Sequence, residues 1–165
     1  MSDKIIYICG FMGAGKSFCG RDAAYHSGKS YLDLDDYIVR RENKPITKIF
    51  EDGGEAAFRE AEFSALKFAE AELISLGGGA VTYEKSLNFI KENGFLIFLD
   101  IDFPTCYERI TQNGKASRPN AAARTEEELL ELFTKRHEIY SAAADSVARS
   151  PEEFTEILEK VGFYN

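Results

Sequence analysis

The chain has few cysteines and few histidines, and these shortages argue against cross-linked and metal-centred proteins. Only three cysteines (Cys9, Cys19 and Cys106) and two histidines (His26 and His137) occur in 165 residues. The cysteines are scattered, odd in number and form no C-x-x-C pair, which argues against a disulfide framework or a zinc site. The histidines lack the spacing of metal ligands, so we assign them no role. The scattered cysteines fit a reducing compartment.

The chain also lacks a surplus of positive charge and long apolar runs. The formal net charge is −8, so the chain lacks the basic surplus with which nucleic-acid-binding proteins displace counterions. No apolar run approaches the roughly 18 residues that a membrane span needs. The first apolar run, residues 5–9, leads into a glycine-rich loop, so we expect a core strand there and not a signal peptide. We expect a cytoplasmic monomer with one domain, residues 1–165, and no nucleic-acid or membrane partner.

The most informative segment that the chain does contain is a phosphate-binding loop. Residues 10–17 read G-F-M-G-A-G-K-S, which matches the P-loop pattern G-x-x-x-x-G-K-[ST]. Glycines let backbone N–H groups curl around phosphate oxygens, and the following helix presents its positive dipole end to the same anion. Lys16 supplies a charge at the β- and γ-phosphates, and the Ser17 hydroxyl can bind Mg2+. A glycine-rich turn without a ligand is the alternative interpretation.

Short apolar segments alternate with helical patterns along the chain. The segments are almost continuously apolar, as strands covered on both faces must be, and their alternation with helices predicts a parallel sheet flanked by helices. The expected strands are residues 5–9, 31–34, 73–76, 95–99 and, with a weaker pattern, 146–148. The expected helices are residues 16–26, 36–42, 46–51, 55–71, 84–93, 104–112, 125–143 and 151–161. Ligands of such sheets bind beyond the carboxyl ends of the strands, so functional residues are expected there.

Acids follow the second expected strand, and glycines follow the third. Asp33 and Asp35 are two residues apart, so in an extended chain both side chains point to one face. One acid could hold Mg2+, and the other could accept a hydrogen bond or a proton from a substrate hydroxyl. Alternatively, Asp35 or Asp36 caps the next helix. The three glycines 77–79 would let a substrate approach closely, or they form only a flexible turn.

Residues 113–124 have the composition of a mobile lid. The segment contains three cations, Lys115, Arg118 and Arg124, and few residues that could form a core. Such a segment can close over phosphates. A solvated basic loop has the same composition and is the alternative.

Charged residues interrupt the apolar stripes of two expected helices. Arg136 lies in the middle of a stripe formed by Leu129, Leu132, Phe133, Tyr140, Ala143 and Ala144. A buried cation is costly unless an anion meets it, and a carboxylate ligand would be a natural bidentate partner. An internal ion pair or a side chain that reaches outward is the alternative. On the helix after Gly54, Arg59 and Glu62 have the i, i+3 spacing of a pair, which either holds Arg59 for a ligand or is purely structural.

In their order along the chain, these motifs resemble the shikimate kinase family of small P-loop kinases. The resemblance extends from Lys4 to about Val161. Beyond the P-loop it rests on Y-L-D-L-D at 31–35, I-F at 49–50, G-E-x-x-F-R-x-x-E at 54–62, L-G-G-G-A-V at 76–81, Arg118-Pro119 and R-x-x-x-Y at 136–140. The F-R-x-x-E and G-G-G-A-V segments in that order are much more specific than the P-loop. The implied fold is the α/β P-loop kinase fold, a five-stranded parallel sheet flanked by helices on both faces, with a mobile lid.

The resemblance implies an enzyme that phosphorylates the 3-hydroxyl of shikimate with ATP and Mg2+, by in-line transfer, giving shikimate 3-phosphate and ADP. A helical segment at about 35–62 would bind the acceptor, with Arg59 and Arg136 on its carboxylate, Asp35 on its hydroxyls and Glu62 orienting Arg59. The full set implied for shikimate is Asp35, Phe50, Phe58, Arg59, Glu62, Gly78, Gly79 and Arg136. The set implied for ATP is Gly13, Ala14, Gly15, Lys16, Ser17, Phe18, Arg109 and Arg118. Mg2+ would be held by Ser17 and Asp33, and the catalytic residues would be Lys16, Asp35 and Arg118.

The chain departs from the family pattern at three places. Phe18 replaces a threonine or serine, so its N–H remains available but a hydroxyl contact to the α-phosphate is lost. Asn120-Ala121 replaces a Leu-Leu pair in the lid, which weakens an apolar contact to the substrate. Thr111 stands where the family tends to have an arginine, and Arg109 would become the adenine-stacking arginine if the lid were two residues longer.

Other interpretations of the same residues lead to different functions. A P-loop kinase for another small hydroxy-acid, such as gluconate, would share the fold and the phosphate machinery. A non-catalytic nucleotide-binding homologue is a second alternative. The sequence argues against a GTPase switch, because D-x-x-G is absent and Ile46 stands where N-K-x-D requires an acid.

Overall fold

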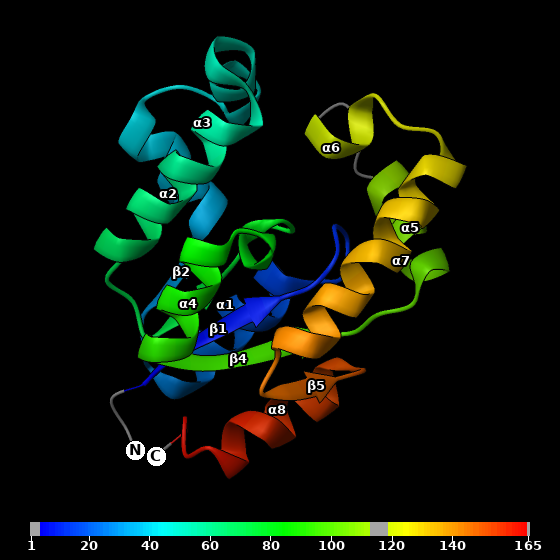
Figure 1. The fold of residues 1–165 in the computed structure, drawn as a ribbon. Helices are drawn as coiled ribbons and strands as arrows, with labels where there is room; N and C mark the ends of the chain where they lie inside the picture. Colours follow the sequence, from blue (N-terminus) through cyan, green and yellow to red (C-terminus); the bar gives the residue numbers. More distant parts are fainter. Residues whose placement is uncertain (1–3, 113–118, 165) are drawn as a thin grey trace.

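Five parallel strands form the centre of the fold in the computed structural model, which describes residues 4–112 and 119–164. The strands are β1 (Ile5–Cys9), β2 (Tyr31–Asp33), β3 (Leu73–Ser75), β4 (Gly94–Leu99) and β5 (Ser146–Ala148). Their order in the sheet is β2-β3-β1-β4-β5, and all neighbours are parallel (Figure 1). The predicted five-stranded parallel sheet is confirmed.

Strand β1 lies in the middle of the sheet and is buried on both faces. It pairs with β3 through Ile6 and Leu73 and with β4 through Ile6 and Phe95. Tyr7 and Ile8 are completely buried. This burial explains why β1 is continuously apolar and does not alternate between apolar and polar residues.

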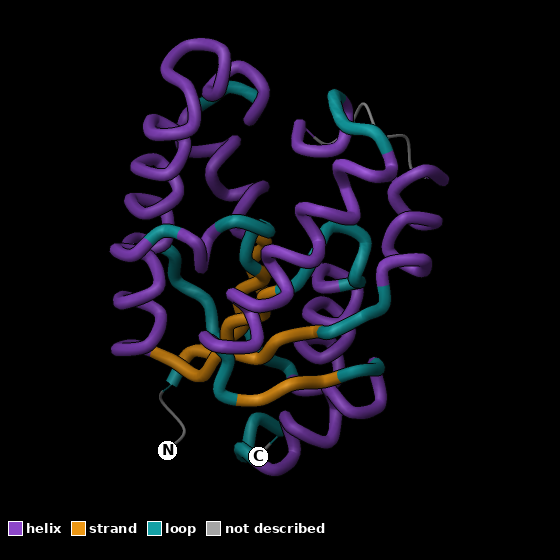
Figure 2. The backbone as a smooth tube through the Cα atoms, turned by 45° about the vertical axis from the view of Figure 1, so that its right-hand side comes forward, coloured by secondary structure: helices purple, strands orange, loops and turns teal. Residues whose placement is uncertain are grey.

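Helices cover both faces of the sheet (Figures 1 and 2). Helices α1 (Lys16–Ser27) and α8 (Pro151–Lys160) contact each other on one face, and α4 (Glu84–Asn93) and α7 (Glu126–Ala143) contact β4 on the other. Helices α2 (Leu34–Glu42) and α3 (Ile46–Phe68) rise beyond the carboxyl ends of the strands. Helices α5 (Phe103–Gln112) and α6 (Pro119–Ala122) rise with part of α7 on the opposite side. A short 3-10 turn, η1 (Ala80–Thr82), follows β3.

The boundary between β2 and α2 differs from the prediction. Strand β2 ends at Asp33 and α2 begins at Leu34, so Asp33 and Asp35 do not lie on one face of an extended strand. Asp33 is itself the cap of α2, because its Oδ1 accepts a hydrogen bond of 3.2 Å from the backbone N–H of Asp36. The expectation that Asp35 or Asp36 caps the helix is therefore wrong. An aspartate at the end of a strand can satisfy the first helical N–H groups, so the helix begins at Leu34 and Asp35 lies in its first turn.

Helix α3 consists of two helical segments joined at Gly54. Gly54 has φ 75° and ψ −170°, which lies outside the helical region. A positive φ favours glycine, so the chain changes direction there at little cost. The predicted segments 46–51 and 55–71 correspond to the two parts, although the second part ends at Phe68. The second segment brings Phe58, Arg59 and Glu62 toward the end of the sheet.

Among residues 4–112 and 119–164, no helix combines the length and apolar character that a membrane span requires.

Candidate active site

The P-loop connects the carboxyl end of β1 to α1, as predicted. Gly13 and Gly15 have φ of 78° and 97°, values that favour glycine. A Cβ atom added to Gly13 would lie 2.6 Å from the carbonyl oxygen of Cys106, so no side chain fits there. The Lys16 Nζ donates hydrogen bonds of 2.8 and 3.0 Å to the carbonyl oxygens of Gly10 and Phe11. The Lys16 side chain thus folds back over the start of the P-loop.

Ser17 and Asp33 meet at the first turns of α1 and α2. The Ser17 Oγ donates a hydrogen bond of 2.7 Å to Asp33 Oδ2. Mg2+ in kinases is typically bound by one or two protein oxygens together with substrate phosphates and water. The hydroxyl and carboxylate oxygens of this pair are the donor type that Mg2+ prefers, so the residues fit the ion. Within the described part of the chain, no group of three or more His, Cys, Asp or Glu side chains could hold a metal ion.

The glycines after β3 are surrounded by charged side chains from three helices. A Cβ atom on Gly77 would lie 2.7 Å from Asp35 Oδ1 of α2 and 3.3 Å from Glu62 Oε2 of α3. A Cβ atom on Gly78 would lie 3.0 Å from Arg136 Nη1 of α7. The acids and the guanidinium group therefore pack closely against the glycine turn. The alternative of a flexible turn without packing does not describe it.

Arg59 is held by an acid on its own helix. The Arg59 Nη1 donates a hydrogen bond of 2.8 Å to Glu62 Oε1, and both side chains are buried. A Cβ atom on Gly79 would collide with the Arg59 guanidinium. The predicted i, i+3 pair is confirmed, and it orients Arg59 across the glycine turn.

Four buried polar atoms in this cluster have no hydrogen-bond partner among the described residues. They are Asp35 Oδ1, Arg59 Nε, Glu62 Oε2 and Arg136 Nη1. The Arg59 Nε lies 3.8 Å from Glu55 Oε1, within range of an ion pair but beyond a hydrogen bond. Buried polar groups are nearly always hydrogen-bonded, so a cluster of exceptions indicates a site for a polar ligand. The atoms comprise two acceptors and two donors, which suits a ligand that has both hydroxyl groups and an anionic group.

Burial changes the ionisation of the same residues. It raises the pKa of Asp35 to about 6, with the nearby Asp33 acting in the same direction and Lys16 opposing it. It raises the pKa of Glu62 to about 7, although the Arg59 guanidinium lowers it. It lowers the pKa of Arg136. An acid with a pKa near 6 is suited to general-base chemistry near neutral pH.

Comparison with known proteins identifies the family. A family model described as shikimate kinase matches residues 12–162. The chain belongs to the shikimate kinase family. A shikimate kinase of Staphylococcus haemolyticus is 34% identical over 158 residues, covering 94% of this chain and 91% of that protein. A shikimate kinase of Aquifex aeolicus is 39% identical over 153 residues, covering 90% and 89%. A solved shikimate kinase of Acinetobacter baumannii in complex with shikimate has a TM-score of 0.84 at 29% identity, covering 96% of this chain and 92% of that chain.

An aromatic pair lies beside Arg59, where the shikimate kinase resemblance implies a pocket wall. The Phe50 and Phe58 rings are stacked, with centroids 4.7 Å apart. The Arg59 guanidinium carbon lies 5.2 Å from the centroid of Phe58. The Phe58 ring thus lies against the guanidinium group, and the contact of either ring with a substrate stays a prediction.

Tyr140 is a site residue to which the sequence interpretation gave no role. Its hydroxyl donates a hydrogen bond to the Gly78 carbonyl oxygen, and its ring is buried. It comes one helical turn after Arg136 on the apolar stripe of α7, which was the available signal. The sequence could not show that the hydroxyl reaches the glycine turn, since 62 residues separate the two.

Arg109 lies against the P-loop. Its Nη1 donates hydrogen bonds of 3.0 and 3.2 Å to the carbonyl oxygens of Gly13 and Ala14. Thr111 instead bonds the carbonyl oxygens of its own helix. Of these two α5 residues, Arg109 is therefore the one beside the nucleotide end of the site. Arg118 and residues 113–118 of the predicted lid lie outside the described residues, and Pro119–Ala122 form α6.

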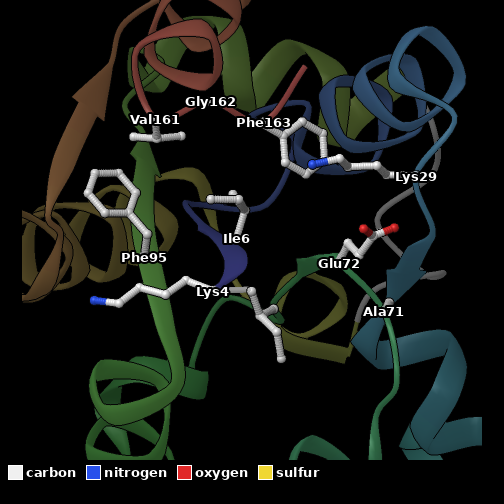
Figure 3. Close-up of a pocket in the computed structure, with 10 residues that line it drawn as sticks. Lys4, Ile6, Lys29, Ala71, Glu72, Phe95, Val161, Gly162 and Phe163 are labelled. Carbon is white, nitrogen blue, oxygen red and sulfur yellow. The ribbon is translucent and has the colours of Figure 1, made fainter. Parts of the chain in front are cut away.

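A cavity of about 500 Å³ lies at the amino ends of β1 and β4 (Figure 3). Figure 3 shows Ile6, Phe95, Val161 and Phe163 around it, with Lys29 over the Phe163 ring. Its strand residues stand at the starts of β1 and β4, opposite the P-loop. It contains none of the predicted site residues.

Proposed function

We propose that the chain transfers the γ-phosphoryl group of ATP to the 3-hydroxyl of shikimate in an Mg2+-dependent reaction. The observation that carries the proposal is the cluster of four unpartnered buried polar atoms beside the P-loop. Membership of the shikimate kinase family and the shikimate complex of the Acinetobacter baumannii relative support the same acceptor. The matches give no support to a gluconate-type acceptor or to a non-catalytic homologue.

The acceptor site is built for a hydroxylated carboxylic acid. Arg59 and Arg136 would bind the carboxylate, because a guanidinium group can donate two parallel hydrogen bonds to a carboxylate. The unpartnered Asp35 Oδ1 would accept a hydrogen bond from a ring hydroxyl. Glu62 keeps Arg59 in place, while Gly78 and Gly79 leave room for the guanidinium groups of Arg136 and Arg59. Phe50 and Phe58 would cover an apolar side of the pocket.

The donor site holds the triphosphate through backbone and side-chain groups. The N–H groups of the P-loop and of the first turn of α1 would bind phosphate oxygens. Lys16 would exchange its bonds to the Gly10 and Phe11 carbonyl oxygens for bonds to the β- and γ-phosphates. Ser17 and Asp33 would hold Mg2+, which neutralises charge that develops on the phosphate oxygens. Arg109 would stand beside the nucleotide, and Arg118 would add a cation from the lid.

The reaction is an in-line displacement. The 3-hydroxyl oxygen forms a bond to the γ-phosphorus while the bond from that phosphorus to the β,γ-bridging oxygen breaks, and ADP leaves. Asp35 orients the hydroxyl and accepts its proton. With a pKa of about 6, this carboxylate is mostly ionised at pH 7 and can act as the base. Most of the catalysis in such transfers comes from positioning and charge stabilisation.

A coupled assay of ADP release tests the proposal. The assay compares shikimate with gluconate, quinate and nucleoside monophosphates at equal concentrations. We expect ADP release that depends on shikimate and on Mg2+, with little release for the other acceptors. Release with gluconate but not with shikimate would replace the proposed acceptor, and no release with any acceptor would reject a kinase.

A further inference from the structure

A second cavity, of about 370 Å³, lies beside the P-loop on the nucleotide side of the site. Its walls come from the P-loop, α1, the segment after β4, α5 and the start of α8. The residues that line it are Ala14, Gly15, Phe18, Cys19, Ile101, Arg109 and Pro151. Its volume is in the range of small-molecule binding sites.

Phe18 stands at the mouth of this cavity with an exposed ring. It is the third residue of α1, directly after Lys16 and Ser17, and its side chain is 67% exposed. A phenyl ring has no polar group that could bind a phosphate, so the Phe18 side chain is not explained by phosphate binding. It does offer a flat apolar surface that an aromatic ligand could bury.

Arg109 also lines the cavity. Its Nη1 bonds to the Gly13 and Ala14 carbonyl oxygens hold the guanidinium group on the P-loop. A Cβ atom on Gly15 would lie 3.4 Å from the same nitrogen, so the group also packs against the loop. A planar cation and an aromatic ring therefore border one cavity at the end of the phosphate site, and both kinds of group stack on nucleobases.

We propose that the Phe18 ring packs against the nucleobase of the phosphate donor and supplies binding that the phosphates do not. This inference rests on the proposed function, because it takes the donor to be a nucleoside triphosphate. The ring replaces a polar contact near the α-phosphate by an apolar contact to the base. Phe18 is thus a binding residue through its side chain as well as through its N–H group.

Intrinsic fluorescence gives a direct test, because the chain contains no tryptophan. In the variant Phe18→Trp, the new indole is the sole tryptophan signal. We expect ADP to quench it in a saturable manner, whereas inorganic tripolyphosphate, which has no base, leaves it nearly unchanged. Tyr25→Trp is the matched control, since Tyr25 is on the same helix, is 84% exposed and does not line the cavity. A response of Phe18→Trp that is equal for both ligands, or no response at all, overturns the proposal.

Binding affinities of a second set of variants test the energetic role. Phe18→Ala should weaken ADP binding by about tenfold, the effect typical of removing one aromatic partner from a base. Its affinity for tripolyphosphate should stay within twofold of the parent chain, and Phe18→Tyr should keep both affinities. Tyr25→Ala should change neither. An equal loss for ADP and tripolyphosphate would mean that the ring acts through the P-loop and not on the base.

These titrations contain no shikimate, so they are independent of the acceptor. ADP release by the unmodified chain tests the proposed reaction alone. Base-dependent quenching without shikimate turnover would retain the role of Phe18 and reject the proposed function. Turnover of shikimate without base-dependent quenching would support the proposed function and reject the role of Phe18.

Discussion

At the scale of the residue, Arg136 is a buried cation whose place in the fold calls for an explanation. Its side chain is only 7% exposed on the apolar stripe of α7, and its Nη1 has no hydrogen-bond partner among the described residues. Burial lowers its pKa, which means that the fold disfavours the charge. A cation placed at such a cost is best explained by a ligand anion that meets it.

Replacing Arg136 by alanine should weaken acceptor binding selectively. We expect Arg136→Ala to raise the KM for shikimate by about 30-fold or more, since a hydrogen bond to a charged group contributes about 2 kcal/mol. The KM for ATP should change less than twofold in the same steady-state assay. Lys135→Ala is the matched control, because Lys135 is the exposed neighbour on the same helix. An equal loss of ATP affinity would show that Arg136 is structural.

We expect the ionised Asp35 carboxylate to serve catalysis and, at neutral pH, to lower the stability of the fold. Its pKa in the fold is about 6, above the ordinary value of 3.8, and burial is the main cause. Between these values the folded chain binds more protons than the unfolded chain, so the contribution of Asp35 to stability falls as the pH rises. Asp35→Asn should therefore raise the melting temperature at pH 7.5, corresponding to at most about 3 kcal/mol, and the gain should vanish below pH 4.

The same substitution should lower kcat by about 100-fold or more, as expected for removal of a general base. Thermal melts between pH 4 and 8, with kcat measured in parallel, provide the check. A pH-independent difference in melting temperature would contradict the raised pKa. An unchanged kcat would remove Asp35 from the mechanism.

At the scale of elements, the turn after β3 positions the guanidinium groups. Gly78 lies under Arg136 and accepts a hydrogen bond from Tyr140, and Gly79 lies under Arg59. The backbone of Gly79 has φ −105°, which any residue can adopt. A glycine is needed at this position to make room for a side chain from α3, and not for backbone freedom.

Gly79→Ala is consequently a steric test of one contact. The new Cβ atom should displace the Arg59 guanidinium and raise the KM for shikimate about tenfold or more, with little effect on ATP. The measurement is steady-state kinetics of Gly79→Ala, Arg59→Ala and the double variant. If the turn acts through Arg59, the double variant should be no worse than Arg59→Ala alone. Additive losses would show that Gly79 has a separate role.

At the scale of the molecule, the order of the strands brings the proposed phosphate-donor site and the proposed acceptor site together. Strands β1 and β3 are neighbours, so the P-loop after β1 and the glycine turn after β3 lie side by side. Strand β2 adds Asp33 next to them, and α7 returns from the other half of the sheet with Arg136.

Because the described residues of the proposed site come together within one chain, we predict an active monomer. Light scattering at assay concentrations should give a mass near 18.5 kDa for these 165 residues. The specific activity should be independent of protein concentration. A mass of twice that value, together with activity that is lost on dilution, would contradict the prediction.

Much of the fold and of the candidate site could be predicted from local patterns in the sequence. The positions of the strands along the chain, the Arg59–Glu62 pair and the place of Arg136 in a buried stripe follow from local sequence patterns, and the structure confirms them. The P-loop motif likewise indicated the phosphate site. The Asp33–Asp35 geometry was predicted wrongly, because a strand and a helical cap compete for the same residues and the sequence does not show which one prevails.

The sequence by itself determined the fold class, the phosphate loop and the residues available to an acceptor. Tertiary structure alone decided that Tyr140 reaches Gly78, that Arg109 bonds the P-loop, and that Phe18 borders a cavity with it. The physical reason is the range of the interactions. Helical and strand periodicity is set by neighbouring residues, whereas these contacts join residues from separate elements and depend on how the whole sheet brings the elements together.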